Sequence, residues 1–129
     1  MATIAEIMSR GLVTVEADVS LEEAARRMDE RHVGAALVLE GESLQGIVTE
    51  RDVLRAVAAG PIEGVSVADC MTRHPETIDA SETTGLAASL MIHGGFRHLP
   101  VLDGERVVGI VSIRDLMRVT LDDETPRGA

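Results

Sequence analysis

The strongest constraint on the fold is an internal duplication. The segment GIVTERD, which begins at Gly46, returns as GIVSIRD, which begins at Gly109, at an offset of 63 residues. At that offset residues 4–56 align with residues 67–119 without a gap, and 18 of the 53 aligned pairs are identical. A repeat of this kind fixes the architecture before any local pattern does. Because a unit of about 60 residues buries only enough surface for marginal stability, we expect the two copies to pack together.

Within each copy the hydrophobic pattern changes in the same order. A helical turn, a brief strand, a helix with one apolar face, two apolar runs around a glycine turn and a closing helix follow one another. In the first copy these six elements are expected, in the same order, at 4–8, at 13–15, from Ser20 onward, and at 35–39, 44–48 and 50–59. In the second copy they are expected at 67–71, 77–78, 83–93, 99–102, 107–111 and 113–121. Ser20 and Glu23 have the spacing of a helix capping box. Each copy is therefore expected to be an α/β unit of the order βαββα.

The repeat also sets the domain boundaries that we expect. Residues 1–60 form the first repeat, 61–66 a linker, 67–121 the second repeat and 122–129 a polar C-terminal tail. The Gly60-Pro61 pair is a typical stop for the last helix of the first copy, because proline cannot continue a helix.

Composition and charge exclude several classes of partner. A formal net charge of −10 opposes attraction to nucleic acid or to an anionic membrane. One cysteine allows no internal disulfide, and no run approaches the roughly 20 apolar residues of a membrane-spanning helix. Phe96 is the single aromatic residue, so a bound base would be held mostly by aliphatic side chains and backbone. We expect a soluble, cytoplasmic protein that binds neither nucleic acid nor membrane.

Neither catalysis nor a structural metal is indicated. The cysteine, Cys70, aligns with Ile7, which is typical of an apolar packing position rather than of a nucleophile. The four histidines lack the paired spacing of zinc ligands, and the chain contains no lysine that would serve a phosphate loop. We therefore expect a protein that is not an enzyme, with no metal site and no required cofactor.

The end of each repeated segment has two readings. Thr49 with Asp52, and Ser112 with Asp115, have the spacing of a capping box at the start of a helix, and capping alone accounts for both pairs. A carboxylate also accepts two hydrogen bonds from a sugar diol, and a helix N-terminus offers N–H groups to a phosphate. The residue types leave capping and ligand binding open, and the two roles are compatible.

Taken together, these features resemble the tandem cystathionine-β-synthase (CBS) domain pair, also called a Bateman module. The resemblance covers nearly the whole chain. It rests on the βαββα order, the Gly-Ile-Val-Thr/Ser-x-x-Asp segment of both copies, the Arg-His-Leu-Pro-Val stretch at 97–101, and the Met-Ser and Met-Thr dipeptides at 8–9 and 71–72. It implies two repeats packed through their sheets as a pseudo-two-fold pair, and a homodimer of such pairs.

The resemblance further implies a function. Such a protein would be a non-enzymatic sensor that binds an adenine nucleotide or related adenosyl ligand (AMP, ATP, S-adenosylmethionine or NAD) in the cleft between the repeats and signals to a protein partner. The alternative is an interaction or scaffold module whose cleft is empty or vestigial, in which the Thr/Ser-x-x-Asp segments act only as caps.

The family's ligand-contacting positions can be carried over to this sequence. The resulting candidates are Thr14, Ile47, Thr49 and Asp52 in the first copy, and Thr77, Arg97, His98, Ile110, Ser112, Arg114 and Asp115 in the second. Where the second copy has the basic pair at 97–98, the first has Gly34 and Ala35. We therefore expect two unequal sites, with a phosphorylated ligand at the second copy.

Overall fold

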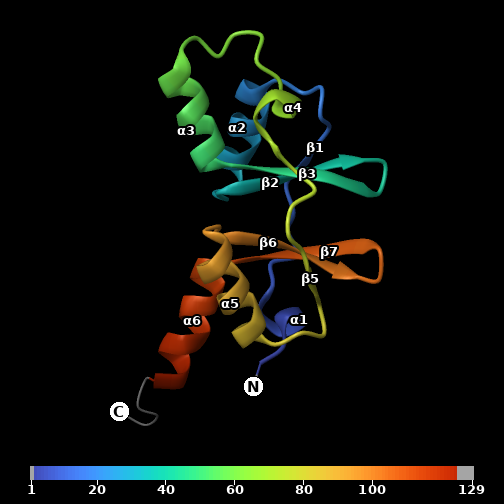
Figure 1. The fold of residues 1–129 in the computed structure, drawn as a ribbon, viewed down its shortest axis with the longest axis vertical. Coiled ribbons are helices and arrows are strands. Elements are labelled where there is room, and N and C mark those ends of the chain that lie inside the picture. Colours follow the sequence, from blue (N-terminus) through green and yellow to red (C-terminus); the bar gives the residue numbers. More distant parts are fainter. Residues whose placement is uncertain (1, 125–129) are drawn as a thin grey trace. The chain divides into compact units, whose positions relative to one another are not determined.

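The computed structural model describes the backbone of residues 2–124 and the side chains of residues 2–121. It has the mixed α/β fold that the sequence predicts, with two sheets and helices on one face of each (Figure 1). The chain divides into two compact units. We call residues 12–75 the first-repeat unit, and residues 1–11 with 76–129 the second-repeat unit.

The first-repeat unit contains a four-stranded sheet in the order β1-β2-β3-β4. Strand β1 runs parallel to β2, whereas β2 with β3, and β3 with β4, are antiparallel. Its elements are β1 (Thr14–Val15), α2 (Leu21–Glu30), β2 (Ala35–Glu40), β3 (Ser43–Thr49), α3 (Glu50–Ala59), α4 (Val67–Cys70) and β4 (Thr72–Arg73). The predicted hairpin and both long helices are confirmed, and strand β4 is an addition.

The second-repeat unit has a three-stranded sheet in the order β5-β6-β7, with the same parallel and antiparallel pairing. Its elements are α1 (Ile4–Ile7), β5 (Ile78–Asp79), α5 (Thr84–Gly94), β6 (His98–Asp103), β7 (Arg106–Ser112) and α6 (Ile113–Glu124). Helix α6 continues for three residues into the segment that we expected to be a polar tail at 122–129, because no glycine or proline interrupts it there. Residues 125–129 lie outside the described residues.

The compact units differ from the consecutive repeats of the sequence, because the short helix at the start of each repeat packs with elements of the other repeat. In the first-repeat unit, the N–H groups of Val67 and Ala68 donate to the carbonyls of Val19 (2.8 Å) and Ala17 (2.9 Å). In the second-repeat unit, Ala5 N–H donates to the carbonyl of Ala80 (2.9 Å). Each unit therefore includes a segment from the other copy.

The glycine of each repeated segment has a direct physical reason. A Cβ atom on Gly46 would lie 2.6 Å from the carbonyl oxygen of Thr72 and 2.9 Å from Met71 Sδ. A Cβ on Gly109 would likewise lie 2.6 Å from Met8 Sδ and 2.9 Å from the carbonyl oxygen of Ser9. Only glycine allows such close backbone approach. The Met-Thr and Met-Ser dipeptides are thus the segments that cross these glycines.

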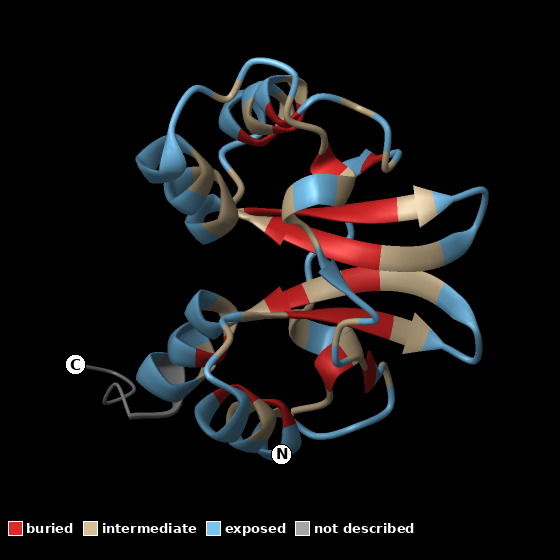
Figure 2. Ribbon diagram, turned by 45° about the horizontal axis from the view of Figure 1, so that its top comes forward, coloured by how far each residue is buried: buried red, intermediate tan, exposed pale blue. Residues whose placement is uncertain are grey.

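Alternate residues of each sheet fill a core beneath the helices. The first-repeat unit buries Val13, Val15, Leu21, Ala24, Met28, Ala36, Val38, Val48 and Val67 in one cluster. The second-repeat unit buries Ile4, Ile78, Ala87, Met91, Leu99, Val101, Val111 and Leu116. Buried residues concentrate on the strands and on the helix faces turned toward them (Figure 2). This side-chain alternation leaves the remaining strand residues on the opposite face of each sheet.

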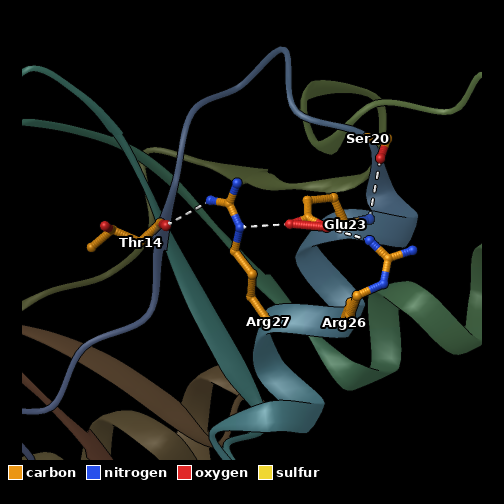
Figure 3. Close-up of polar contacts among 5 residues, drawn as sticks. All are labelled: Thr14, Ser20, Glu23, Arg26 and Arg27. Carbon is orange, nitrogen blue, oxygen red and sulfur yellow. Dashed lines mark hydrogen bonds and ion pairs between the residues drawn. The ribbon is translucent and has the colours of Figure 1, made fainter.

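Helix α2 begins with only half of the predicted capping box. Ser20 Oγ accepts a hydrogen bond from the Glu23 N–H (3.1 Å), as expected. The Glu23 carboxylate instead accepts hydrogen bonds from Arg27 Nε (3.0 Å) and from Arg26 (Figure 3). The hydrogen bond from Arg27, followed by that from Arg26, lowers the pKa of Glu23. The expected return bond to Ser20 is therefore wrong, because two nearby guanidinium groups are stronger partners than one amide.

Candidate functional site

Ser112 and Asp115 form a complete capping box at the start of α6. The N–H of Ser112 donates to Asp115 Oδ2 (2.8 Å), and the N–H of Asp115 donates to Ser112 Oγ (3.2 Å). The Ser112 hydroxyl also donates to Asp115 Oδ2 (3.0 Å). The capping reading of this pair is therefore confirmed. All three bonds leave Asp115 Oδ1 outside the box.

Thr49 and Asp52 repeat this arrangement at the start of α3, where a capping box is also present. The N–H of Thr49 donates to Asp52 Oδ2 (2.8 Å), and the Thr49 hydroxyl lies 3.2 Å from the same oxygen. Among the residues that the structure describes, Asp52 Oδ1 has no hydrogen-bond partner. A carboxylate has about four lone-pair sites, so capping through one oxygen leaves the other able to accept a hydrogen bond.

Strand register brings several of the predicted residues into one row. In the first-repeat unit, Thr14 of β1 and Ile47 of β3 both pair with Leu37 of β2, and Ile47 pairs on its other side with Thr72. Arg27 of α2 contacts β1, since its Nη1 lies 3.5 Å from the carbonyl oxygen of Thr14 (Figure 3). The row therefore presents a threonine on each side of two apolar residues.

The second-repeat unit builds the corresponding row from Ile110 of β7, which pairs with Pro100 of β6 and bridges to Ser9. Thr77 was predicted to lie in a strand, but β5 begins one residue later, at Ile78. His98 pairs directly with Ser112 across β6 and β7, and this register places the imidazole-bearing residue beside the cap of α6. Ile110, His98 and Ser112 therefore share one sheet face.

Two of the three basic residues predicted for the second copy are exposed. Arg97 and Arg114 are exposed, and His98 is partly buried. Asp115, whose side chain is 16% exposed, has an additional neighbour in Arg118, whose Nη1 lies 3.7 Å from Oδ1. Arg118 was not among the residues predicted from the sequence. Its identity with Arg55 at the 63-residue offset, three residues after an aspartate in both copies, was the signal that would have found it.

Within the described part of the chain, no group of three His, Cys, Asp or Glu side chains is arranged to hold a metal ion. None of the described helices is long and apolar enough to cross a membrane. Burial raises the pKa of the Cys70 thiol.

This fold and these motifs define a CBS domain protein. The CBS domain family model matches residues 4–59 and 67–122, and the chain therefore belongs to that family. A protein with CBS domains from Burkholderia ambifaria has a similar structure, with a TM-score of 0.90 and 32% identity over 99% of this chain and 100% of its own.

Two similar structures were solved with adenosyl compounds. The CBS domain protein PAE2072 from Pyrobaculum aerophilum, complexed with AMP, has a TM-score of 0.85 and 26% identity, over 95% of this chain and 97% of its own. The CBS domain pair of protein MJ0100, in complex with 5′-methylthioadenosine and S-adenosyl-L-methionine, has a TM-score of 0.89 and 25% identity, over 96% and 99%.

Proposed function

We propose that this protein is a non-enzymatic sensor of an adenosyl ligand, either an adenine nucleotide (AMP, ATP or NAD) or S-adenosylmethionine. The ligand would act as a regulatory signal rather than as a required cofactor. Binding would shift a conformational equilibrium, and a protein partner would respond to the shift. Such a response requires only that the ligand binds the two states with unequal affinity.

The observation that carries the proposal is that the two carboxylate oxygens of each aspartate have different roles. In Asp52 and Asp115 one oxygen, Oδ2, serves the helix cap, and Oδ1 lies outside it. An ionised carboxylate oxygen is a suitable acceptor for the hydroxyl groups of a ribose. The adenosyl compounds bound to PAE2072 and to the MJ0100 domain pair support a ligand of this class.

The neighbouring groups suit the remainder of the ligand. The first turns of α3 and α6 offer positive potential to a phosphate. In the second-repeat unit the basic residues Arg97, His98 and Arg114 would contact the phosphate, which favours AMP or ATP there. Ile47 and Ile110 would contact the base, and Thr14 and Thr77 would supply polar contacts to its edge.

Isothermal titration calorimetry with AMP, ATP, NAD and S-adenosylmethionine tests the proposal. We expect at least one of these compounds to bind, and Asp115→Asn to abolish binding at the second-repeat unit. The substitution should leave the fold intact and cost roughly 1 kcal/mol or less of stability, from weakened capping and dipole interactions. Asp29→Asn, at an exposed position of α2, is the matched control and should leave binding unchanged.

The scaffold alternative makes a different prediction for the same variants. If the Thr/Ser-x-x-Asp segments act only as caps, Asp115→Asn changes the stability of the protein and nothing else. Absence of binding by the wild-type protein at millimolar concentrations of all four compounds would refute the sensor proposal and favour a scaffold.

We also propose that the protein is a homodimer through α3 and α6. Leu54 and Val57 on α3, and Met117 on α6, are each more than half exposed. Exposed apolar side chains gathered on helices are typical of a surface that another chain covers.

Light scattering after size-exclusion chromatography should give the mass of a dimer, which Met117→Glu should convert to a monomer. Ile92→Glu, on the exposed side of α5, is the control, and a monomeric wild type would refute the assembly.

A further inference from the structure

The two units differ in charge at one equivalent pair of positions. The N–H of Glu50 donates to the carbonyl of Gly34 (3.0 Å), and the N–H of Ile113 donates to the carbonyl of Arg97 (2.9 Å). The same backbone bond therefore joins the first residue of the closing helix to the residue that precedes the hairpin. A glycine and an acid occupy these places in the first-repeat unit, and an arginine and an isoleucine occupy them in the second.

The Glu50 carboxylate lies against Gly34. A Cβ atom placed on Gly34 would lie 3.2 Å from Glu50 Oε1 and 3.5 Å from Oε2. Arg97 is the equivalent residue in the second-repeat unit. The Glu50 carboxylate therefore lies close to the place that corresponds to the Cβ atom of Arg97. Among the described residues Glu50 forms no ion pair with an arginine or histidine, so its negative charge is not neutralised by direct contact.

Two arginines that follow each cap are common to both copies. Arg51 corresponds to Arg114, and Arg55 corresponds to Arg118, at the 63-residue offset. These arginines are therefore present in both copies, although Arg118 also lies 3.7 Å from Asp115 Oδ1. Two exchanges beside the cap remain, that of the Gly34 and Glu50 pair for Arg97 and an apolar residue, and that of Ala35 for His98. The first exchange changes the local formal charge from −1 to +1.

We infer that Glu50 makes the Thr49/Asp52 site selective for adenosyl ligands that carry no phosphate. This inference rests on the proposed function and deepens it. A neutral compound such as 5′-methylthioadenosine, or a cationic one such as S-adenosylmethionine, would bind beside the Glu50 carboxylate without electrostatic penalty. A nucleotide phosphate would meet that carboxylate at close range, whereas in the second-repeat unit it would meet Arg97. The two sites would then report two different classes of metabolite.

The size of the effect follows from Coulomb's law. One carboxylate about 6 Å from a phosphate dianion, in surroundings nearly as polar as water, weakens binding by about tenfold. Adenosine-like ligands without charge should be nearly unaffected. The ratio of the two affinities, rather than either affinity alone, is therefore the quantity that identifies the role of Glu50.

The experiment uses the full chain with one site disabled. In Asp115→Asn protein, which keeps the Thr49/Asp52 site, calorimetry should show 5′-methylthioadenosine binding more tightly than AMP. Adding Glu50→Gln should raise AMP affinity about tenfold and leave 5′-methylthioadenosine affinity within about twofold. Glu42→Gln, an exposed acid in the hairpin turn, removes the same charge elsewhere and should change neither affinity.

A reciprocal variant tests the same idea at the other site. In Asp52→Asn protein, Ile113→Glu should weaken AMP binding about tenfold and spare 5′-methylthioadenosine. If both ligands bind but the affinity ratio does not respond to Glu50→Gln or to Ile113→Glu, the selectivity inference is wrong and the proposed function still holds. If neither ligand, nor ATP, NAD or S-adenosylmethionine, binds the wild-type protein, the proposed function fails and the inference fails with it.

Discussion

The close contact at Gly46 allows a quantitative prediction for Gly46→Ala. The new Cβ atom would lie 2.6 Å from the carbonyl oxygen of Thr72, and real Cβ atoms essentially never approach closer than 3.0 Å. Strand β4 must therefore recede from β3 by at least 0.4 Å, the difference between these distances. The obstructing oxygen belongs to the backbone of a paired strand, so a side-chain rotation cannot relieve the contact.

The cost can be worked out from two contributions. Inserting a methyl group into a packed site costs about 1–3 kcal/mol. Weakening a hydrogen bond between β3 and β4 adds up to about 1 kcal/mol. We therefore expect Gly46→Ala to lower the free energy of unfolding by about 1–4 kcal/mol. With a urea m-value of about 2 kcal/mol/M, that corresponds to a midpoint lower by about 0.5–2 M.

Urea unfolding followed by far-ultraviolet circular dichroism is the suitable assay, because the sequence contains neither tryptophan nor tyrosine. Gly85→Ala provides a matched control within α5. A Cβ there would have Thr83 Oγ1 as its nearest neighbour, at 3.8 Å. Because the added methyl group meets no obstruction, the substitution should stabilise the helix by about 0.5–1 kcal/mol. If the free energy of unfolding of Gly46→Ala equals that of the wild type, or increases as that of Gly85→Ala does, the Met71–Thr72 segment does not lie against β3 as described.

Three further predictions concern single residues. Ser112→Ala removes the acceptor for the Asp115 N–H and should cost about 0.5–2 kcal/mol in the same urea assay; no loss would mean that the cap contributes nothing. Hydrogen bonds from the Ser81 hydroxyl and N–H lower the pKa of Asp79, so this group stabilises the fold above the unfolded pKa of about 4, and the contribution is lost as the pH falls through the folded value. Asp79→Asn should therefore show a shallower loss of stability on acidification than the wild type, and an equally steep loss would refute the assignment. Cys70, whose pKa is raised by burial, should react with Ellman's reagent more slowly in the native protein than in urea, and equal rates would contradict its packing.

Local sequence patterns were sufficient for most of the fold. The hairpins, the two helices of each copy and the capping role of Ser112 with Asp115 follow from hydrophobic period and short-range hydrogen bonding, which act within a few residues. The duplication then determined that both copies have the same order of elements. The proposed ligand contacts of residues such as Arg97 stay predictions, since they depend on groups far apart in the sequence.

Other features were decided only by the tertiary structure. Sequence periodicity does not show which strand a short segment joins, so the pairing of Thr72–Arg73 with β3 appeared only in the fold. The need for glycine at position 46 follows from that pairing. The ion pair of Arg118 with Asp115, and the Glu50 carboxylate over Gly34, likewise depend on where long side chains come to lie. A sequence specifies local conformation directly, whereas the neighbours of each side chain are set by the packing of the whole unit.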